Sequence, residues 1–120
     1  MILYFAYGSN LDASHMQYRC PNAGVPNPGC LKGFRLDFTR YSPKWSCGVA
    51  DVVESEGGEV WGLVYEITKS DRDALDMYEG HPKRYIRSET TIHTKEEELE
   101  KVWMYTVREK AGFPPPIKAI

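Results

Sequence analysis

The pattern of apolar and polar positions predicts several strands along this chain. Residues 2–7 are mainly aromatic and branched, and such side chains suit a pleated, mostly buried surface. In residues 31–41, Phe34, Leu36 and Phe38 alternate with polar residues. This period of two predicts a strand with one buried face and one face in water.

A hairpin is predicted in the middle of the chain. Residues 48–54 and 59–67 have the composition of strands, and the segment between them ends in two glycines that can supply the positive φ of a tight turn. One side of the second strand carries only large apolar side chains, so we expect that side to face the core. These residues are Trp61, Leu63, Tyr65 and Ile67.

Two more strands are predicted near residues 85–93 and 101–107, with a charged turn over residues 95–100 between them. Trp103, in the second of these strands, is expected to fill the core together with Trp61. Irregular segments are predicted where proline interrupts the pattern. These segments are residues 20–29, 42–46 and 112–120.

Two short helices are predicted between the strands. The first covers residues 11–19, with Asn10 or Asp12 as its cap. The second begins after Ser70, which we expect to be its N-cap. It ends before Gly80, because glycine readily adopts the left-handed conformation that stops a helix.

Composition agrees with a globular class. The chain has 120 residues, of which 42% are hydrophobic and 27% charged, which fits one domain over residues 1–120. Together with the elements above, this predicts a small α+β domain. Its curled, mostly antiparallel β-barrel-like sheet is accompanied by two or three short helices.

Charge and segment patterns limit the partners. The net charge is −2 and the Lys and Arg residues are scattered, so we expect no nucleic-acid partner. No apolar run approaches the roughly 20 residues needed to cross a bilayer, and no secretory signal is recognised at the start of the sequence. We therefore expect no membrane partner and a cytoplasmic location.

The cysteines are Cys20, Cys30 and Cys47. They are odd in number and lack the spacing of metal ligands, so we expect them to be reduced and expect no metal site. A cysteine nucleophile paired with His15 or His81 is an alternative reading of the same residues.

The first candidate site is the turn Tyr7-Gly8-Ser9-Asn10, which follows the first strand. Gly8 and Asn10 tolerate a left-handed backbone, so successive N–H groups can point into one concavity. Such a nest binds carboxylates or stabilises an oxyanion. The alternative is an ordinary turn between strand and helix, with Ser9 or Asn10 as the helix cap.

The second candidate is Glu79, a carboxylate at the end of the second predicted helix. It lies four positions after Leu75 and next to Tyr78, so it belongs to the apolar stripe that faces the core. Desolvation and the helix dipole would both raise its pKa, which suits a group that accepts and returns a proton. The alternative is a salt bridge to Arg84 or Arg87, which would lower the pKa.

Three tyrosines are further candidates. Tyr7, Tyr85 and Tyr105 have hydroxyl groups that can donate hydrogen bonds into a pocket. The alternative, favoured for Tyr105, is that they are core residues whose hydroxyl groups are satisfied within the protein.

Several motifs in this order are similar to those of one family. An apolar strand runs into YGSNL within residues 4–11, EVWGLVY lies at residues 59–65, and LDMYEG at residues 75–80 is followed by Tyr85. Together they cover about residues 2–107. In this combination the chain resembles the γ-glutamylcyclotransferase-like (AIG2-like) family.

The resemblance implies a barrel-like fold in which the turn and the acidic residue converge on one cavity. It implies an enzyme, of transferase or lyase type, that cyclises a small γ-glutamyl amide to 5-oxoproline and releases the attached amine, without a metal or organic cofactor. Glu79 is then the general base and acid, and the N–H groups of Gly8 to Asn10 are donors to the oxyanion. The substrate-binding residues implied are Tyr7, Gly8, Ser9, Asn10, Leu11, Tyr85 and Tyr105.

Other questions stay open at the level of sequence. Longer members of the family continue with a helical region where this sequence has its tail, so the substrate is open among glutathione, γ-glutamyl amino acids and γ-glutamyl-amines. A homodimer is an alternative to a monomer. The same cavity in a non-catalytic module that binds a small carboxylate is the second hypothesis, and a peptide-binding domain that uses Pro114 to Pro116 is the third.

Overall fold

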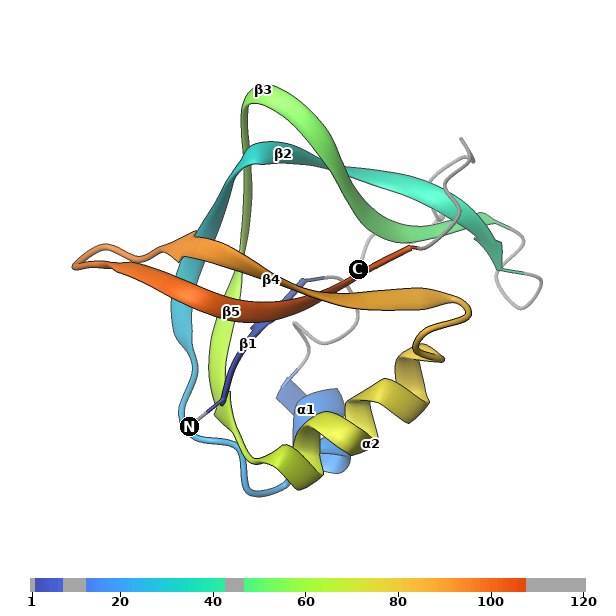
Figure 1. The fold of residues 1–120 in the computed structure, drawn as a ribbon, viewed down its shortest axis with the longest axis vertical. Coiled ribbons are helices and arrows are strands. Elements are labelled where there is room, and N and C mark those ends of the chain that lie inside the picture. Colours follow the sequence, from blue (N-terminus) through green and yellow to red (C-terminus); the bar gives the residue numbers. More distant parts are fainter. Residues whose placement is uncertain (1, 8–12, 43–46, 108–120) are drawn as a thin grey trace.

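A computed structural model describes the backbone of residues 2–7, 13–42 and 47–107, and the side chains of residues 2–7, 16–37 and 51–107. Five strands and two helices follow one another along this part of the chain (Figure 1). They are β1 (Ile2–Ala6), α1 (Ala13–Arg19), β2 (Asn27–Ser42), β3 (Cys47–Ile67), α2 (Lys69–Glu79), β4 (Tyr85–His93) and β5 (Glu98–Val107).

The strands close into a barrel in the order β1-β3-β2-β4-β5. Neighbouring strands are antiparallel except β1 and β5, which run parallel with Tyr4 opposite Trp103. The two helices lie together beside one side of the barrel (Figure 1). The predicted fold class, a curled and mostly antiparallel sheet with short helices, is confirmed.

Two hydrophobic clusters stabilise this arrangement. There are two because successive residues of a strand point to opposite faces of the sheet. The cluster inside the barrel contains Phe5, Leu31, Val52, Val60, Val64, Ile92, Val102 and Met104. The cluster between the barrel and the helices contains Tyr4, Ala6, Met16, Cys20, Tyr65, Ile67, Leu75 and Tyr105. Strands β1, β3 and β5 contribute to both clusters, so parts of these strands are buried on both faces.

Trp61 shows where the outer face of the barrel is left uncovered. We predicted that it fills the core, but its side chain is 60% exposed, whereas Tyr65 and Ile67 on the same side of β3 are buried. The helices cover only part of the outer face of the barrel. On this side of β3, Trp61 is therefore exposed to solvent, whereas Tyr65 and Ile67 further along the strand are buried in the core. Trp103 is half-buried. The prediction that both tryptophans fill the core is therefore wrong for Trp61 and true only in part for Trp103.

Strand β3 is continuous where we predicted a hairpin. It pairs with β2 along almost its whole length, and the register shifts between the pairs Lys32–Glu59 and Phe34–Glu54. Gly57 does have a positive φ, of 76°, but it serves this irregularity inside the strand and no chain reversal occurs there. Gly58 is needed because a Cβ at this position would lie 2.3 Å from the carbonyl oxygen of Phe34.

Helix α2 begins earlier than predicted. Its N-cap is Thr68 and not Ser70, because the Thr68 hydroxyl accepts from the backbone N–H of Asp71 (3.1 Å) and the Asp71 carboxylate accepts from the Thr68 N–H (3.0 Å). This reciprocal pair is a capping box. Gly80 ends the helix with φ 68°, as predicted. In the described part of the chain no helix is long and apolar enough to span a bilayer.

The other boundaries differ in smaller ways. Strand β2 starts within the segment predicted to be a loop, because its first residues already pair with β3. Strand β5 starts at Glu98, inside the predicted charged turn. Leu36 was expected on the buried face of β2 but is exposed. Strand β4 lies where it was predicted. The predictions for residues 11–12, 43–46 and 112–120 lie outside the described residues.

Candidate functional site

Several strands begin or end at the same rim of the barrel. Strands β1 and β5 are parallel, so Ala6 and Val107, their last residues, point toward the same rim. Strand β4 runs antiparallel to β5, which brings its first residue, Tyr85, opposite Val107. Tyr7 follows β1 at this rim. Sequence positions far apart in the chain are therefore neighbours here.

The Tyr7 hydroxyl is the centre of this cluster. It donates a hydrogen bond to the main-chain carbonyl of Tyr105, 98 residues away in sequence. Burial raises the pKa of Tyr7 well above its ordinary value, and the nearby Asp51, Tyr85 and Glu79 raise it further. The hydroxyl therefore stays protonated, and the two carboxylates lie close enough to act on it electrostatically.

Glu79 is the last residue of α2, and its side chain is half-buried. It lies one turn after the buried Leu75, and its half-burial agrees only in part with the predicted position on the core-facing side. Tyr78, which we placed on the same stripe, is 46% exposed and packs under the guanidinium group of Arg19. The raised pKa expected for Glu79 stays a prediction.

Tyr105 contributes its backbone to the cluster and its side chain to the core. Its hydroxyl donates to Oδ1 of Asp76 at 2.6 Å, and the ring is buried. Burial, together with the Asp76 carboxylate, raises the pKa of Tyr105. Its hydroxyl is thus satisfied within the protein, as our alternative interpretation had it, while its role toward a substrate stays a prediction.

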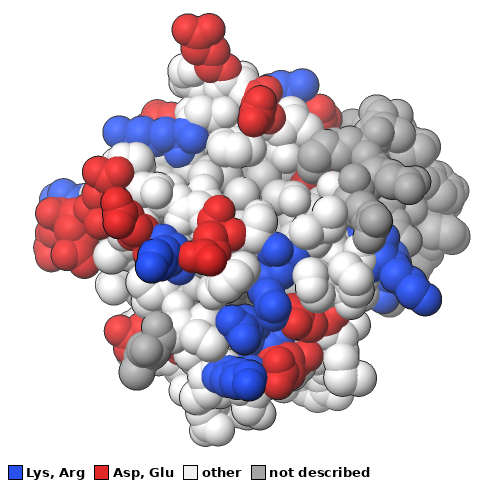
Figure 2. All heavy atoms as spheres, in the orientation of Figure 1, with Lys and Arg blue, Asp and Glu red and all other residues white. Residues whose placement is uncertain are grey.

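Asp76 also holds the end of α2 onto the sheet. Nη1 of Arg87 donates to Oδ2 of Asp76 at 2.6 Å. This ion pair of Arg87 is made with Asp76, whereas our alternative interpretation paired Arg87 or Arg84 with Glu79. The guanidinium groups of Arg87 and Arg72 lie 5.0 and 5.5 Å from the centre of the Trp103 ring. Figure 2 shows basic and acidic side chains close together on the face of the molecule that is viewed there. These contacts fix the last turns of α2, and with them the position of Glu79.

Asp51 is a member of the cluster that the sequence reasoning missed. It lies in β3, is completely buried, and accepts a hydrogen bond from the N–H of Val107 at 3.0 Å. The signal in the sequence was an acidic residue inside the apolar run of residues 49–53. A charge in such a run is expensive to bury, which makes it a candidate for function.

The cysteines and histidines do not form a second centre in the described part. Burial and the nearby Asp71 raise the pKa of Cys20 to about 11, so its thiol is protonated at neutral pH. Cys30 is also buried, with a raised pKa caused first by desolvation. Nδ1 of His81 accepts from the backbone N–H of Arg87. Within the described residues, no three His, Cys, Asp or Glu side chains are arranged to hold a metal ion.

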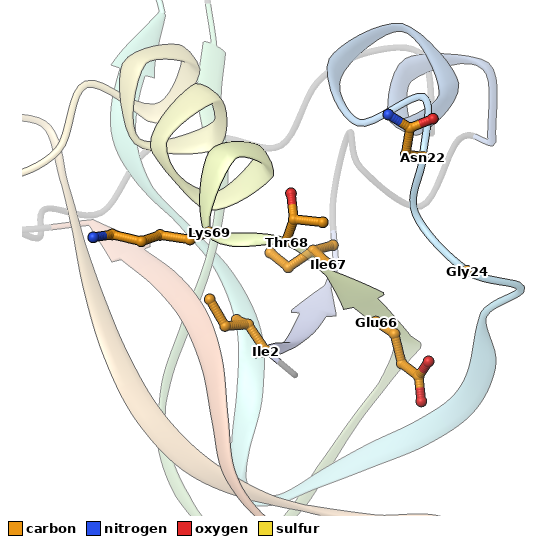
Figure 3. Close-up of a pocket in the computed structure, with 7 residues that line it drawn as sticks. All are labelled: Ile2, Asn22, Gly24, Glu66, Ile67, Thr68 and Lys69. Carbon is orange, nitrogen blue, oxygen red and sulfur yellow. The ribbon is translucent and has the colours of Figure 1, made fainter.

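Two hollows lie at opposite ends of α2. One, of about 450 Å³, lies at the N-terminal end of the helix (Figure 3) and is lined by Ile2, Asn22, Gly24, Glu66, Ile67, Thr68 and Lys69. The other, of about 420 Å³, lies at the C-terminal end and is lined by Asp76, Met77, Gly80 and residues 81–84. Among the described residues, none of the predicted site residues lines either hollow.

Of the predicted side chains, Tyr7 and Tyr85 lie at the same rim of the barrel, and Glu79 is near enough to Tyr7 for its charge to raise the pKa of Tyr7. Tyr105 takes part through its carbonyl oxygen. The predictions for the remaining site residues lie outside the described residues. These are Gly8, Ser9, Asn10 and Leu11.

Known proteins similar to this chain agree with the motifs. A family model described as "Gamma-glutamyl cyclotransferase, AIG2-like" matches residues 4–119. Proteins from Bos taurus and Homo sapiens, both named gamma-glutamylcyclotransferase, are 36% and 35% identical to this chain over 118 residues. Each alignment covers 94% of this chain but 63% of the relative, so the chain spans less than two thirds of the length of these curated relatives.

Solved structures agree in fold. One named gamma-glutamyl cyclotransferase has a TM-score of 0.86 at 34% identity, with 95% of this chain and 70% of that chain covered. YkqA from Bacillus subtilis has a TM-score of 0.79 at 25% identity, with 96% of this chain and 44% of that chain covered. From its motifs, its barrel and these matches, the chain belongs to the gamma-glutamyl cyclotransferase, AIG2-like family.

Proposed function

We propose that this protein is a γ-glutamylcyclotransferase, which converts a small γ-glutamyl amide into 5-oxoproline and a free amine. The observation that carries the proposal is that Tyr7 and Tyr85 lie at one rim of the barrel, with the Glu79 carboxylate near enough to raise the pKa of Tyr7. The chain leaves this rim at Tyr7 to enter the Gly8-Ser9-Asn10 segment. Membership in the family and the names of its relatives support the same reaction.

In the proposed mechanism Glu79 moves the protons. It removes a proton from the α-ammonium group of the substrate, and the freed amine nitrogen attacks the γ-carbonyl carbon of the same molecule. A tetrahedral intermediate forms with negative charge on its oxygen. When the bond from this carbon to the departing nitrogen breaks, Glu79 returns the proton to the leaving amine, and the ring nitrogen gives its second proton to water. One carboxylate thus serves as general base and then as general acid.

The remaining groups hold and stabilise the reacting atoms. In our proposal the backbone N–H groups of Gly8 to Asn10 donate to the developing oxyanion. Tyr85 and Tyr7 border the substrate from the ends of β4 and β1. Because nucleophile and electrophile belong to one molecule, the site mainly has to select a folded conformer of the substrate and exclude water.

The first experiment measures 5-oxoproline by mass spectrometry after incubation with glutathione, a γ-glutamyl amino acid or a γ-glutamyl-amine. Glu79→Gln keeps the size of the side chain and removes the base, so we expect kcat to fall by about 10²–10⁴-fold. The matched control is Asp73→Asn, an exposed carboxyl-to-amide change on the same helix, which should leave the rate unchanged.

Either of two results would contradict the proposal. Full activity of the Glu79→Gln variant would remove Glu79 from the mechanism. Tight binding of the γ-glutamyl compounds without any 5-oxoproline would favour the non-catalytic binding module. Light scattering of the same preparation would test the homodimer, which stays a prediction.

A further inference from the structure

Residues 80–84 connect α2 to β4 and separate two of the predicted site residues (Figure 1). Glu79 is the last residue of the helix, and Tyr85 is the first residue of the strand. The connection is short, so the position of Glu79 relative to Tyr85 depends on the contacts that hold these few residues in place.

The side chain of His81 joins this connection to β4. Its ring nitrogen Nδ1 accepts a partly buried hydrogen bond from the backbone N–H of Arg87 at 3.1 Å. The backbone N–H of His81 in turn donates to the Asp76 carbonyl at 2.9 Å. His81 therefore holds the last turn of α2 with its backbone and the beginning of β4 with its ring.

The Arg87 N–H needs such a partner because it points away from β5. In an antiparallel ladder, every second pair of opposite residues directs its N–H and C=O groups away from one another. Arg87 and Tyr105 form such a pair. The Arg87 N–H reaches the His81 ring on one side, and the Tyr105 carbonyl accepts from the Tyr7 hydroxyl on the other. Among the described residues, β2 pairs with β4 at His93 alone, so the ring takes the place of a strand neighbour.

A histidine can fill this place only while its ring is neutral. In the neutral ring with its proton on Nε2, Nδ1 accepts a hydrogen bond, whereas both nitrogens of a protonated ring are donors. Histidine is also the side chain whose charge ordinarily changes between about pH 5 and 8. A proton on Nδ1 of His81 would turn two N–H groups toward each other and leave the Arg87 N–H without its acceptor, which is costly for a partly buried group.

The charged groups around this ring offer little to compensate for that loss. Lys83 and Arg84, from the same connection, line a hollow together with the ring and with Asp76 from α2. The Asp76 carboxylate already accepts two hydrogen bonds, one of them from the guanidinium group of Arg87 on β4. The other carboxylate at this end of α2, Glu79, does not line the hollow. A protonated ring would therefore join two cations beside an acid that is already engaged.

We propose that His81 is a positioning residue whose neutral ring holds the start of β4 against the end of α2, and that a proton on this ring releases the bond and lowers the activity in acid. This inference rests on the proposed function, because Glu79 and Tyr85 are the groups whose positions it fixes. A small displacement of a reacting group lowers the rate strongly. The ion pair of Asp76 with Arg87 still joins the two elements, so loss of the His81 bond should lower kcat about tenfold without abolishing it.

Two variants separate the acceptor from the titrating ring. In His81→Asn the amide oxygen can take the place of Nδ1 and carries no titrating proton, whereas His81→Ala offers no acceptor. At about pH 8, where a histidine is ordinarily neutral, His81→Asn should form 5-oxoproline with nearly the kcat of the wild type. His81→Ala should have a kcat about tenfold lower.

The pH dependence is the readout that a merely structural role would not change. As the pH falls to about 5, the ratio of the wild-type kcat to that of His81→Asn should decrease about tenfold. Glu79 is present in both proteins, so its own titration cancels in this ratio. The matched control is His93→Asn, which removes a histidine at the far end of β4 and should keep the pH dependence of the wild type.

An NMR titration of the wild-type protein tests the bond itself and needs neither a variant nor turnover. The amide proton of Arg87 should shift upfield in step with the protonation of the His81 ring, because it loses its hydrogen bond. Its protection against hydrogen exchange should fall about tenfold over the same range. In His81→Asn both quantities should stay constant.

The outcomes distinguish this inference from the proposed function. An Arg87 amide that stays unchanged while the His81 ring titrates would overturn the role of His81. The same pH dependence of kcat in the wild type and in His81→Asn would also overturn it and leave the reaction standing. Loss of the Arg87 bond in acid, without any 5-oxoproline from the wild type at any pH, would support His81 as the residue that holds β4 and contradict the reaction.

Discussion

Asp76 joins helix α2 to the sheet, and its replacement by alanine should loosen that junction. The carboxylate accepts from the Tyr105 hydroxyl and from Arg87, both at 2.6 Å. The side chains of Arg87 and Asp76 are 19% and 20% exposed, so water screens the pair only in part. Hydrogen bonds to a charged group contribute about 1.5 kcal/mol each at the lower end of their range. We therefore expect Asp76→Ala to lower the free energy of unfolding by about 2–3 kcal/mol.

The contribution of each partner can be separated with a double-mutant cycle. Tyr105→Phe removes only the hydroxyl and should lower the free energy of unfolding by about 1–1.5 kcal/mol. Once Asp76 is alanine, the same change should have little further effect, so the coupling energy should be about 1 kcal/mol. Urea denaturation followed by tryptophan fluorescence is a suitable assay. With a typical m-value, Asp76→Ala should lower the midpoint by about 1–2 M urea.

Two results would refute this reasoning. A loss below about 0.5 kcal/mol for Asp76→Ala would mean that solvent replaces both partners at little cost. Strict additivity of the two changes would mean that Asp76 and Tyr105 do not interact in solution. If the reasoning holds, the kcat of Asp76→Ala should also fall, because Glu79 lies three residues further along the same helix.

Three further measurements test other parts of the structure. Gly80→Ala should lower the free energy of unfolding by about 1–2 kcal/mol, because φ at this position is 68° and the new Cβ would lie 2.3 Å from the Arg84 side chain; an unchanged melting temperature would contradict this. Burial raises the pKa of Cys20 from 9.0 to about 11, so the unfolded chain loses that proton first and stability should decrease as pH rises from 9 to 11. Denaturation curves of Cys20→Ala across that range should show a smaller decrease. Phe5 is completely buried inside the barrel, so Phe5→Ala should lower the free energy of unfolding by about 3–5 kcal/mol. Trp61 is exposed, so Trp61→Gln should change it by less than about 0.5 kcal/mol. Equal effects of the two changes would contradict the assignment of Phe5 to the inside and Trp61 to the outside of the barrel.

Local signals in the sequence predicted some elements well. The apolar strand before Tyr7, the strand over residues 85–93 and the glycine stop after α2 depend on side chains within a few residues of one another. The prediction of a tight turn at residues 55–58 was wrong because a glycine pair gives the same local signal in a tight turn and in an irregularity within a strand. Pairing with β2, more than 20 residues away in sequence, decides between them.

The candidate site was predictable to the extent that its residues carry local signals. Glu79 stood out on an apolar helix face, and Tyr7 and Tyr85 stood beside recognisable motifs. Asp51 was missed because nothing near it in sequence shows that its neighbour is Val107, 56 residues later. The prediction that Trp61 fills the core was wrong for a related reason. The composition of a strand does not tell which stretch of its outer face the helices will cover.

The parallel pairing of β1 with β5 has a consequence for how the molecule folds. Among the described strands, β1 is synthesised first, but one of its two neighbours, β5, is synthesised last. The Tyr7–Tyr105 bond spans 98 residues and the Asp51–Val107 bond spans 56, so closing these loops has a large entropic cost and should come late. The barrel can close, and the rim that contains Tyr7 can form, only after almost the whole described chain has emerged. A nascent chain that ends before β5 would contain Glu79 and Tyr7 and yet lack the strand that holds Tyr7 in position.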